Sequence, residues 1–139
     1  MICLAAVLCA TIVGCSGRRY DPSMATRHYP AELGQGEILD IQAFREGPNL
    51  IIVNASLQQF ENIDLWLNRR YMHHLDALPA GGTVTLNLND FWDAWGETPV
   101  AGGFFRTDRA TPSVLLQFQF DRNSPMAGAI CIPATPSTF

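Results

Sequence analysis

The sequence predicts an all-β fold, an antiparallel β-sandwich of about seven or eight strands. Apolar and polar residues alternate over short stretches, which is the period of a half-buried strand. These stretches recur about every 10 to 15 residues, and Gly, Pro and Asn, the residues that form turns, separate them. No segment between them shows the period of a long helix.

The first half of the chain contains predicted strands with clear inward faces. In 37–44 we expect Leu39, Ile41 and Ala43 to share one face, because side chains alternate along a strand. The run 50–55 is apolar enough for the centre of a sheet. The next two predicted strands are 63–68, with Ile63, Leu65 and Leu67 inward, and 70–75, with Tyr71, His73 and Leu75 on one face.

The second half contains further strands and one interruption. Segment 83–89 alternates most regularly, while 90–96 breaks the alternation. Asp90 is a favourable N-cap and Gly96 a helix stop, which predicts one short helical turn. The predicted strands are 83–89 (Val84, Leu86 and Leu88 inward), a short one at 104–106, a strong one at 113–121 (Val114, Leu116, Phe118 and Phe120 on one face) and a last one at 126–132.

This pattern of strands and turns resembles the small immunoglobulin-like and fibronectin-like sandwiches of cell surfaces. The resemblance concerns architecture alone, because the Cys…Trp…Cys spacing of immunoglobulin domains does not occur. A sheet closed into a barrel is the alternative architecture.

The N-terminus contains the most specific motif of the chain. Residues 1–13 are apolar and uncharged, with the length of a signal-peptide core and not of a membrane-spanning helix. The sequence Ile12-Val13-Gly14-Cys15 follows and resembles the lipobox of bacterial lipoproteins. The resemblance implies cleavage of a 1–14 signal peptide, a diacylglycerol on the Cys15 sulfur and an acylated new amino terminus. The alternative is that 1–15 is a buried N-terminal strand or helix of a cytosolic domain.

The lipoprotein resemblance sets the expected organisation of the chain. Residues 15–36 follow as a lipidated cysteine and a flexible tether rich in Gly, Pro and Ser, with a reach of roughly 25 Å. Residues 37–133 form the β-sandwich domain, and 134–139 form a frayed tail. Arg18 and Arg19, at the root of the tether, are placed to touch anionic head groups or to remain solvated.

Composition narrows the function classes. The 139 residues carry a net charge of −4 and all basic residues are scattered arginines, which argues against a nucleic-acid surface. Cys3 and Cys9 fall in the leader and Cys15 at the lipid site, so Cys131 has no disulfide partner in the mature chain. Its apolar surroundings predict a buried, inert thiol.

We expect no metal, no cofactor and no catalytic residue. His73 and His74 are adjacent on a predicted strand and point to opposite faces, so they do not share an ion easily. Asp90, Asp93 and Glu97 offer carboxylates, but capping and the positive end of a helical turn explain Asp90 and Asp93 better than acid–base catalysis does.

Aromatic residues concentrate in the segment that interrupts the strands. This cluster either forms a lid over the core or presents a partner-binding surface together with Arg106 and Arg109. Trp66, between two inward residues, faces the other side of its sheet and is a second candidate contact. The candidate partner contacts are Trp66, Trp92, Trp95, Phe105 and Arg106, and the whole cluster comprises Phe91, Trp92, Trp95, Phe104 and Phe105.

The expected function is that of a lipid-anchored, non-catalytic interaction or structural module of the cell envelope, on the periplasmic face or in the outer membrane. Ser16 stands where some bacteria of the resembling class carry an inner-membrane retention aspartate, which favours the outer membrane under those sorting rules. The expected partners are the membrane, through the anchor, and an envelope protein or glycan. The alternative is a small-ligand or carbohydrate-binding sandwich that uses the Trp-rich segment 91–105, and an enzyme is third.

Overall fold

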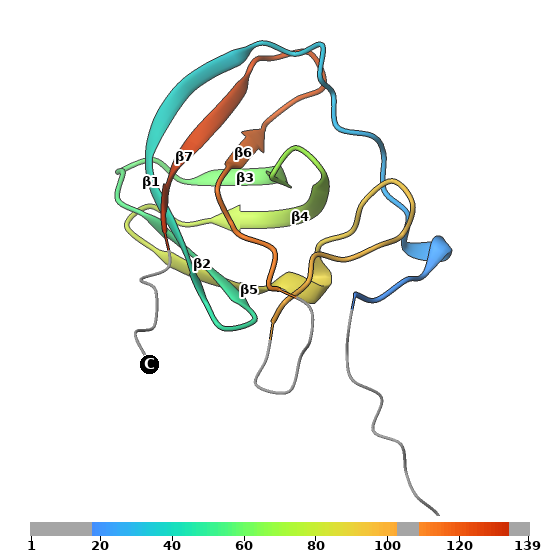
Figure 1. Cartoon of the computed structure of the whole chain (residues 1–139). Coiled ribbons are helices and arrows are strands. Elements are labelled where there is room, and N and C mark those ends of the chain that lie inside the picture. Colours follow the sequence, from blue (N-terminus) through green and yellow to red (C-terminus); the bar gives the residue numbers. More distant parts are fainter. Residues whose placement is uncertain (1–17, 103–108, 134–139) are drawn as a thin grey trace, which may run out of the picture.

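A computed structural model describes residues 18–102 and 109–133 and contains one seven-stranded sheet (Figure 1). The prediction of an all-β fold is confirmed. The strands are β1 (Gln35–Glu46), β2 (Asn49–Asn54), β3 (Phe60–Leu67), β4 (Tyr71–Leu78), β5 (Thr83–Asn87), β6 (Leu116–Gln119) and β7 (Met126–Ile132). Two short 3-10 turns, η1 (Pro22–Met24) and η2 (Leu88–Asp90), are the described helical elements.

The sandwich prediction is not confirmed. All strands belong to one sheet in the order β4-β3-β6-β7-β1-β2-β5, which curls until it is nearly barrel-shaped (Figure 1). The expected purely antiparallel pairing is also wrong at one place, because β1 pairs with β7 in parallel. The C-terminal strand β7 lies between β6 and β1, so the two ends of the domain meet in the middle of the sheet. Strand spacing along the chain does not encode this choice of neighbours.

The curled sheet encloses one core, and the predicted inward faces of the first strands are confirmed. Ile41 and Ala43 of β1 and Ile63, Leu65 and Leu67 of β3 are buried in a single cluster. Burying an aliphatic side chain of this size stabilises the fold by about 1.5–3 kcal/mol relative to leaving it exposed. The alternation in the sequence thus predicted which faces of these strands form the core.

The predicted helical turn over 90–96 is wrong in place and in kind. The 3-10 turn comes earlier, and Asn87, not Asp90, caps it with its side chain, which accepts from the Asn89 amide at 2.9 Å. Residues 91–93 are extended because Trp92 forms a two-way backbone bridge with Met72 of β4. This bridge ties the 91–98 loop to the sheet.

The predicted strand over 113–121 is shorter than expected, and its two ends lie outside the core. Val114 and Phe120 are exposed, whereas Leu116 and Phe118 are fully buried. The Asn68 side-chain oxygen accepts from the backbone amides of Val114 and Leu115, at 3.1 and 3.2 Å, which replaces a strand ladder at that end.

Residues 18–34, which the sequence assigns to a flexible tether, lie across the folded domain, and we call them the strap. In Figure 1 the strap runs beside the 91–98 loop and continues to the start of β1. Its backbone bonds to that loop from Asp21 to Gly96 (2.7 Å) and from Thr26 to Asp93 (2.9 Å). Within residues 18–102 and 109–133, no helix is long and apolar enough to cross a bilayer.

Candidate functional site

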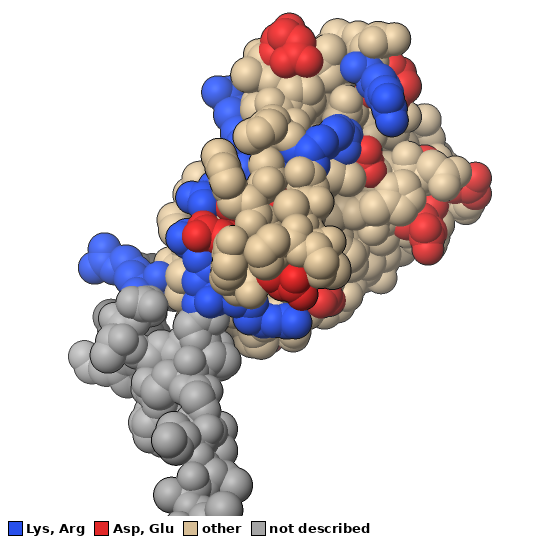
Figure 2. Space-filling model, turned by 90° about the vertical axis from the view of Figure 1, so that its right-hand side faces the viewer, with Lys and Arg blue, Asp and Glu red and all other residues tan. Residues whose placement is uncertain are grey.

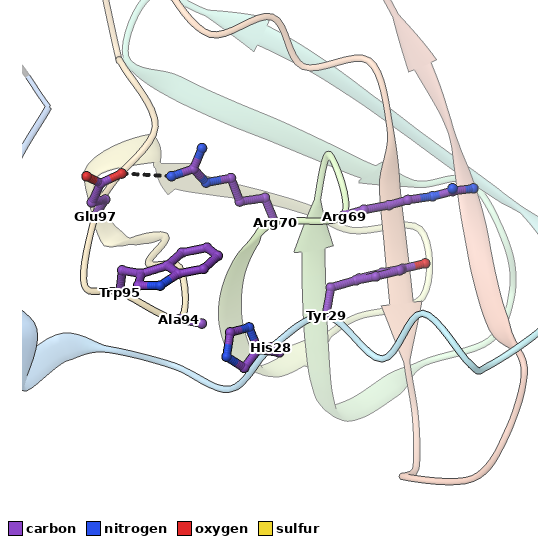
Figure 3. Close-up of a pocket in the computed structure, with 7 residues that line it drawn as sticks. All are labelled: His28, Tyr29, Arg69, Arg70, Ala94, Trp95 and Glu97. Atoms are coloured by element: carbon purple, nitrogen blue, oxygen red, sulfur yellow. Dashed lines mark hydrogen bonds and ion pairs between the residues drawn. The ribbon is translucent and has the colours of Figure 1, made fainter.

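A shallow pocket of about 650 Å³ lies where the strap meets the β3–β4 turn and the 91–98 loop (Figure 3). Each of these three segments contributes side chains, although they are far apart in sequence. We call it the Trp95 pocket. It is lined by His28 and Tyr29 of the strap, Arg69 and Arg70 of the turn, and Ala94, Trp95 and Glu97 of the loop.

Asp93 organises one wall of the Trp95 pocket from beneath. Its fully buried carboxylate accepts from the backbone amides of Trp95 and Glu97, both at 2.9 Å, through one oxygen. The other oxygen accepts from Nε and Nη2 of Arg70, at 2.8 and 2.7 Å. Burial alone raises the pKa of Asp93, but these amides and the Arg70 guanidinium outweigh burial and hold that pKa below its ordinary value.

A second carboxylate connects the strap to this wall. Glu97 Oε2 accepts from Arg70 Nη2 at 2.7 Å and from Arg18 Nη1 at 3.0 Å. Arg18 also donates to the Thr98 carbonyl and to the Tyr71 hydroxyl, at 3.2 and 3.1 Å. Both carboxylates of the wall are therefore neutralised by guanidinium groups.

Trp95 is the exposed aromatic of the pocket, with 59% of its surface accessible. The Arg70 guanidinium lies 5.8 Å from the centre of its ring, and the His28 ring approaches edge-on at 5.4 Å. Figure 3 shows His28 and Arg70 flanking the indole, while Arg69 extends the other way. Arg69 is exposed, adopts a left-handed backbone (φ 57°) and has no hydrogen bond or ion pair with the described residues.

The other two predicted tryptophan contacts are buried. Trp66 does face away from the core cluster, as expected, but Arg27 covers its ring at 5.0 Å and Tyr29 packs edge-on at 5.5 Å. Trp92 is only 6% exposed and lies beneath Arg19, at 5.3 Å. Both rings are therefore covered by strap residues and help to hold the strap on the domain. Phe105, Arg106 and Cys15 lie outside the described residues.

His73 and His74 have separate partners. His74 Nδ1 lies 2.8 Å from Asp64, and His73 Nδ1 lies 3.1 Å from the Asp90 carbonyl. Among the residues that the structure describes, no three His, Cys, Asp or Glu side chains converge as metal ligands. Cys131 is half-buried, and burial raises the pKa of its thiol.

The sequence pattern did not predict the strap residues of the pocket, because His28 falls within the expected tether. Residues 18–30 nevertheless contain a signal: Arg18, Arg19, Tyr20, Arg27 and Tyr29 are unusual for a flexible linker, which has few aromatic residues. The structure shows that these residues contact the 91–98 loop, β3 and β6.

Comparison with protein-family models, curated proteins and solved structures gives no match to this chain. The chemistry of the pocket is therefore the guide to its function. An exposed indole face beside guanidinium groups suits flat groups, which stack on the ring, and anionic groups, which pair with a guanidinium.

Proposed function

We propose that the chain is a lipid-anchored protein of the bacterial cell envelope and that its folded part is a non-catalytic interaction module. The lipobox-like sequence Ile12-Val13-Gly14-Cys15 after an apolar run supports the anchor. Two lipid groups on Cys15, a diacylglycerol and an amino-terminal acyl chain, hold a protein stably at a membrane where one chain holds it only marginally.

The exposed Trp95 is the observation that carries the interaction proposal. Trp and Arg are the residue types most enriched at the energetic centres of interfaces. Asp93 and Glu97, the carboxylates of the pocket wall, are both bound by guanidiniums, and the lowered pKa of Asp93 makes that carboxylate a poor proton acceptor. This chemistry favours recognition over acid–base catalysis.

A carbohydrate or other small ligand is the second candidate function. The open ring of Trp95 offers a stacking platform, and the pocket of about 650 Å³ has the size of a small-ligand site. Its polar rim, with His28 and Arg70, offers donors to a sugar hydroxyl or a carboxylate.

The anchor is tested by membrane fractionation of the native protein beside Cys15→Ala, together with the mass of the mature amino terminus. We expect the native chain to be membrane-bound and to begin at a lipid-modified Cys15, and the variant to remain unprocessed. A native protein that is soluble and begins at Met1 contradicts the anchor.

The interaction surface is tested by thiol labelling in intact envelopes. Trp95→Cys is compared with Leu57→Cys as an exposed control away from the pocket. Leu57 is fully exposed and lies in the β2–β3 loop, next to the end of β4 that is farther from the Trp95 pocket. We expect a membrane-impermeant maleimide to label position 57 and not position 95. Equal labelling contradicts the interaction module, and protection of position 95 that free glycan fragments relieve favours the carbohydrate alternative.

A further inference from the structure

Because the strap is docked from Arg18 onward, the connection between Cys15 and the domain is short. Arg18 is fixed by its hydrogen bonds to Thr98, Glu97 and Tyr71. Three peptide units separate Cys15 from Arg18, and such a connection spans at most about 11 Å. A free tether over residues 15–36 reaches roughly 25 Å. The docked strap therefore holds the domain closer to an anchoring bilayer than a free tether would.

We infer that the Trp95 pocket and the start of the strap rest against the bilayer that holds Cys15, and that anionic phospholipid head groups are the ligand of this surface. The inference rests on the proposed lipidation of Cys15 and names the partner of the proposed interaction surface. With the connection this short, the end of the domain that carries Arg18 stays within reach of the head-group layer, which is about 5–8 Å deep on each side.

The side chains at this end suit a membrane interface. Tyr20, Met24 and Trp95 are 67%, 46% and 59% exposed, although they are large and apolar. Tyr and Trp are enriched at membrane–water interfaces because their rings are amphipathic. Tyr20 is close to the loop that carries Trp95, since it pairs with Glu97 through an isolated bridge. The strap and the loop thus both expose large apolar side chains at this end of the domain.

The charge of this end favours anionic head groups. Arg70 and Arg18 are occupied by Asp93 and Glu97, but Arg69 has no hydrogen bond or ion pair with the described residues. The Arg19 guanidinium lies over the Trp92 ring and interacts electrostatically with the Asp21 carboxylate. The exposed carboxylate here, Asp21, accepts from the Ser23 amide and hydroxyl. Figure 2 shows several arginines along one margin of the molecule with acidic side chains among them, and side chains of both signs over the rest of that face.

The far end of the same strands provides a natural control. β4 begins at Tyr71, beside Arg18, and ends at Leu78, which pairs with Phe60. The seven residue steps from Tyr71 to Leu78 span about 24 Å of extended strand. Leu57, in the loop that leads into Phe60, is fully exposed and lies at that far end. The inference places Leu57 in water while Trp95 touches lipid.

Quenching by brominated lipids tests the orientation. The purified lipidated chain is reconstituted into phosphatidylethanolamine–phosphatidylglycerol vesicles with brominated acyl chains, as the native protein, as Trp95→Phe, and as Trp95→Phe combined with Leu57→Trp. We expect quenching in the native protein, its loss in Trp95→Phe, and none at position 57. Near-ultraviolet circular dichroism checks that each variant is folded. Equal quenching at both positions, or none at Trp95, overturns the inference.

The charge requirement is tested with Arg19→Gln and Arg69→Gln in the same vesicles and in phosphatidylcholine alone. Each arginine near an anionic surface changes binding about fivefold, so each variant is expected to lower the ratio of docked to undocked protein by that factor. Undiminished quenching in both variants overturns the role of anionic head groups. The mass of the amino terminus separates the two proposals: an unmodified Cys15 refutes the anchor, whereas a lipidated chain with unquenched Trp95 refutes only the orientation.

Discussion

Trp66 and Trp95 have similar neighbours and opposite exposure. Each indole has an arginine over its ring, Arg27 at 5.0 Å and Arg70 at 5.8 Å, and each has a strap aromatic edge-on. Yet Trp66 is 0% exposed and Trp95 is 59% exposed. Consecutive strap residues contact the two rings, because side chains alternate along an extended chain: Tyr29 packs on Trp66 and His28 on Trp95.

The two indoles also differ in hydrogen bonding: the N–H of Trp66 has a partner within the chain, and the N–H of Trp95 does not have one among the described residues. The Trp66 indole donates to Gln119 Oε1 at 3.0 Å, and Arg27 donates to the same oxygen at 2.5 Å. The Trp95 indole N–H has no hydrogen-bond partner among the described residues. The first cluster is complete within the chain, whereas the second retains an open ring face and an unused donor.

The sharpest test of this contrast is truncation of each indole. Trp66→Ala removes a fully buried ring and leaves the donors and acceptors around it unpaired, so we expect a loss of about 3–5 kcal/mol in the free energy of unfolding. Trp95→Ala should cost about 0.5 kcal/mol or less, because the ring is exposed. Urea denaturation measures both, and losses of equal size would show that the two clusters do not differ.

The strap itself is tested at Gly96. This residue has φ 80°, and a Cβ there would overlap the Asp21 carbonyl, so Gly96→Ala should cost at least about 2 kcal/mol and release the strap. Gly81→Ala is the matched control, because Gly81 has φ 63° with open space around it and should cost only about 1 kcal/mol. Proteolysis between residues 18 and 34 should accelerate in the first variant alone. Equal resistance in both variants would mean that the strap is not held at Gly96.

Removing the Arg70–Asp93 ion pair beneath Trp95 should lower the free energy of unfolding by an amount that depends on pH. Arg70→Ala leaves the buried Asp93 without its guanidinium and should cost about 2 kcal/mol near neutral pH, less than the ~3–5 kcal/mol of a fully buried pair, because Arg70 is 40% exposed. The folded-state pKa of Asp93 is lowered, so its contribution is present above the unfolded pKa of about 3.9 and is lost as the pH falls through the folded value.

Urea midpoints at pH 7 and pH 3 check this dependence. We expect the native protein to lose more stability than Arg70→Ala over that interval. Asp21 and Asp121 also have lowered pKa values from their own hydrogen bonds, and both remain in the variant. The difference between the two proteins therefore reports on the carboxylates that Arg70 binds, Asp93 and Glu97, and identical pH dependence would refute their pairing with Arg70.

The sequence predicted one of the two tryptophan environments better than the other. Period-two alternation was sufficient to place Trp66 on the face opposite Leu65 and Leu67, because strand geometry is local. The residues that cover the Trp66 ring were not predictable. Arg27 and Tyr29 come from a segment whose Gly and Pro content resembles a linker. The parallel pairing of β1 with β7 was not predicted either, because the neighbour of a strand is not encoded in the strand itself. Alternation records which face is buried and not which segment covers it.

The finest test compares the two neighbouring strap residues. The Tyr29 hydroxyl donates to Gln117 Oε1 at 3.0 Å, and Gln117 is buried, so Tyr29→Phe leaves that acceptor unpaired and should cost about 1 kcal/mol. His28→Ala removes only an exposed edge contact to Trp95 and should cost about 0.5 kcal/mol or less. Urea denaturation at one pH suffices, and a larger loss from His28→Ala would mean that the strap is held from the Trp95 side. If the predicted order is found, residues one position apart divide the strap between a face that stabilises the fold and a face that remains exposed.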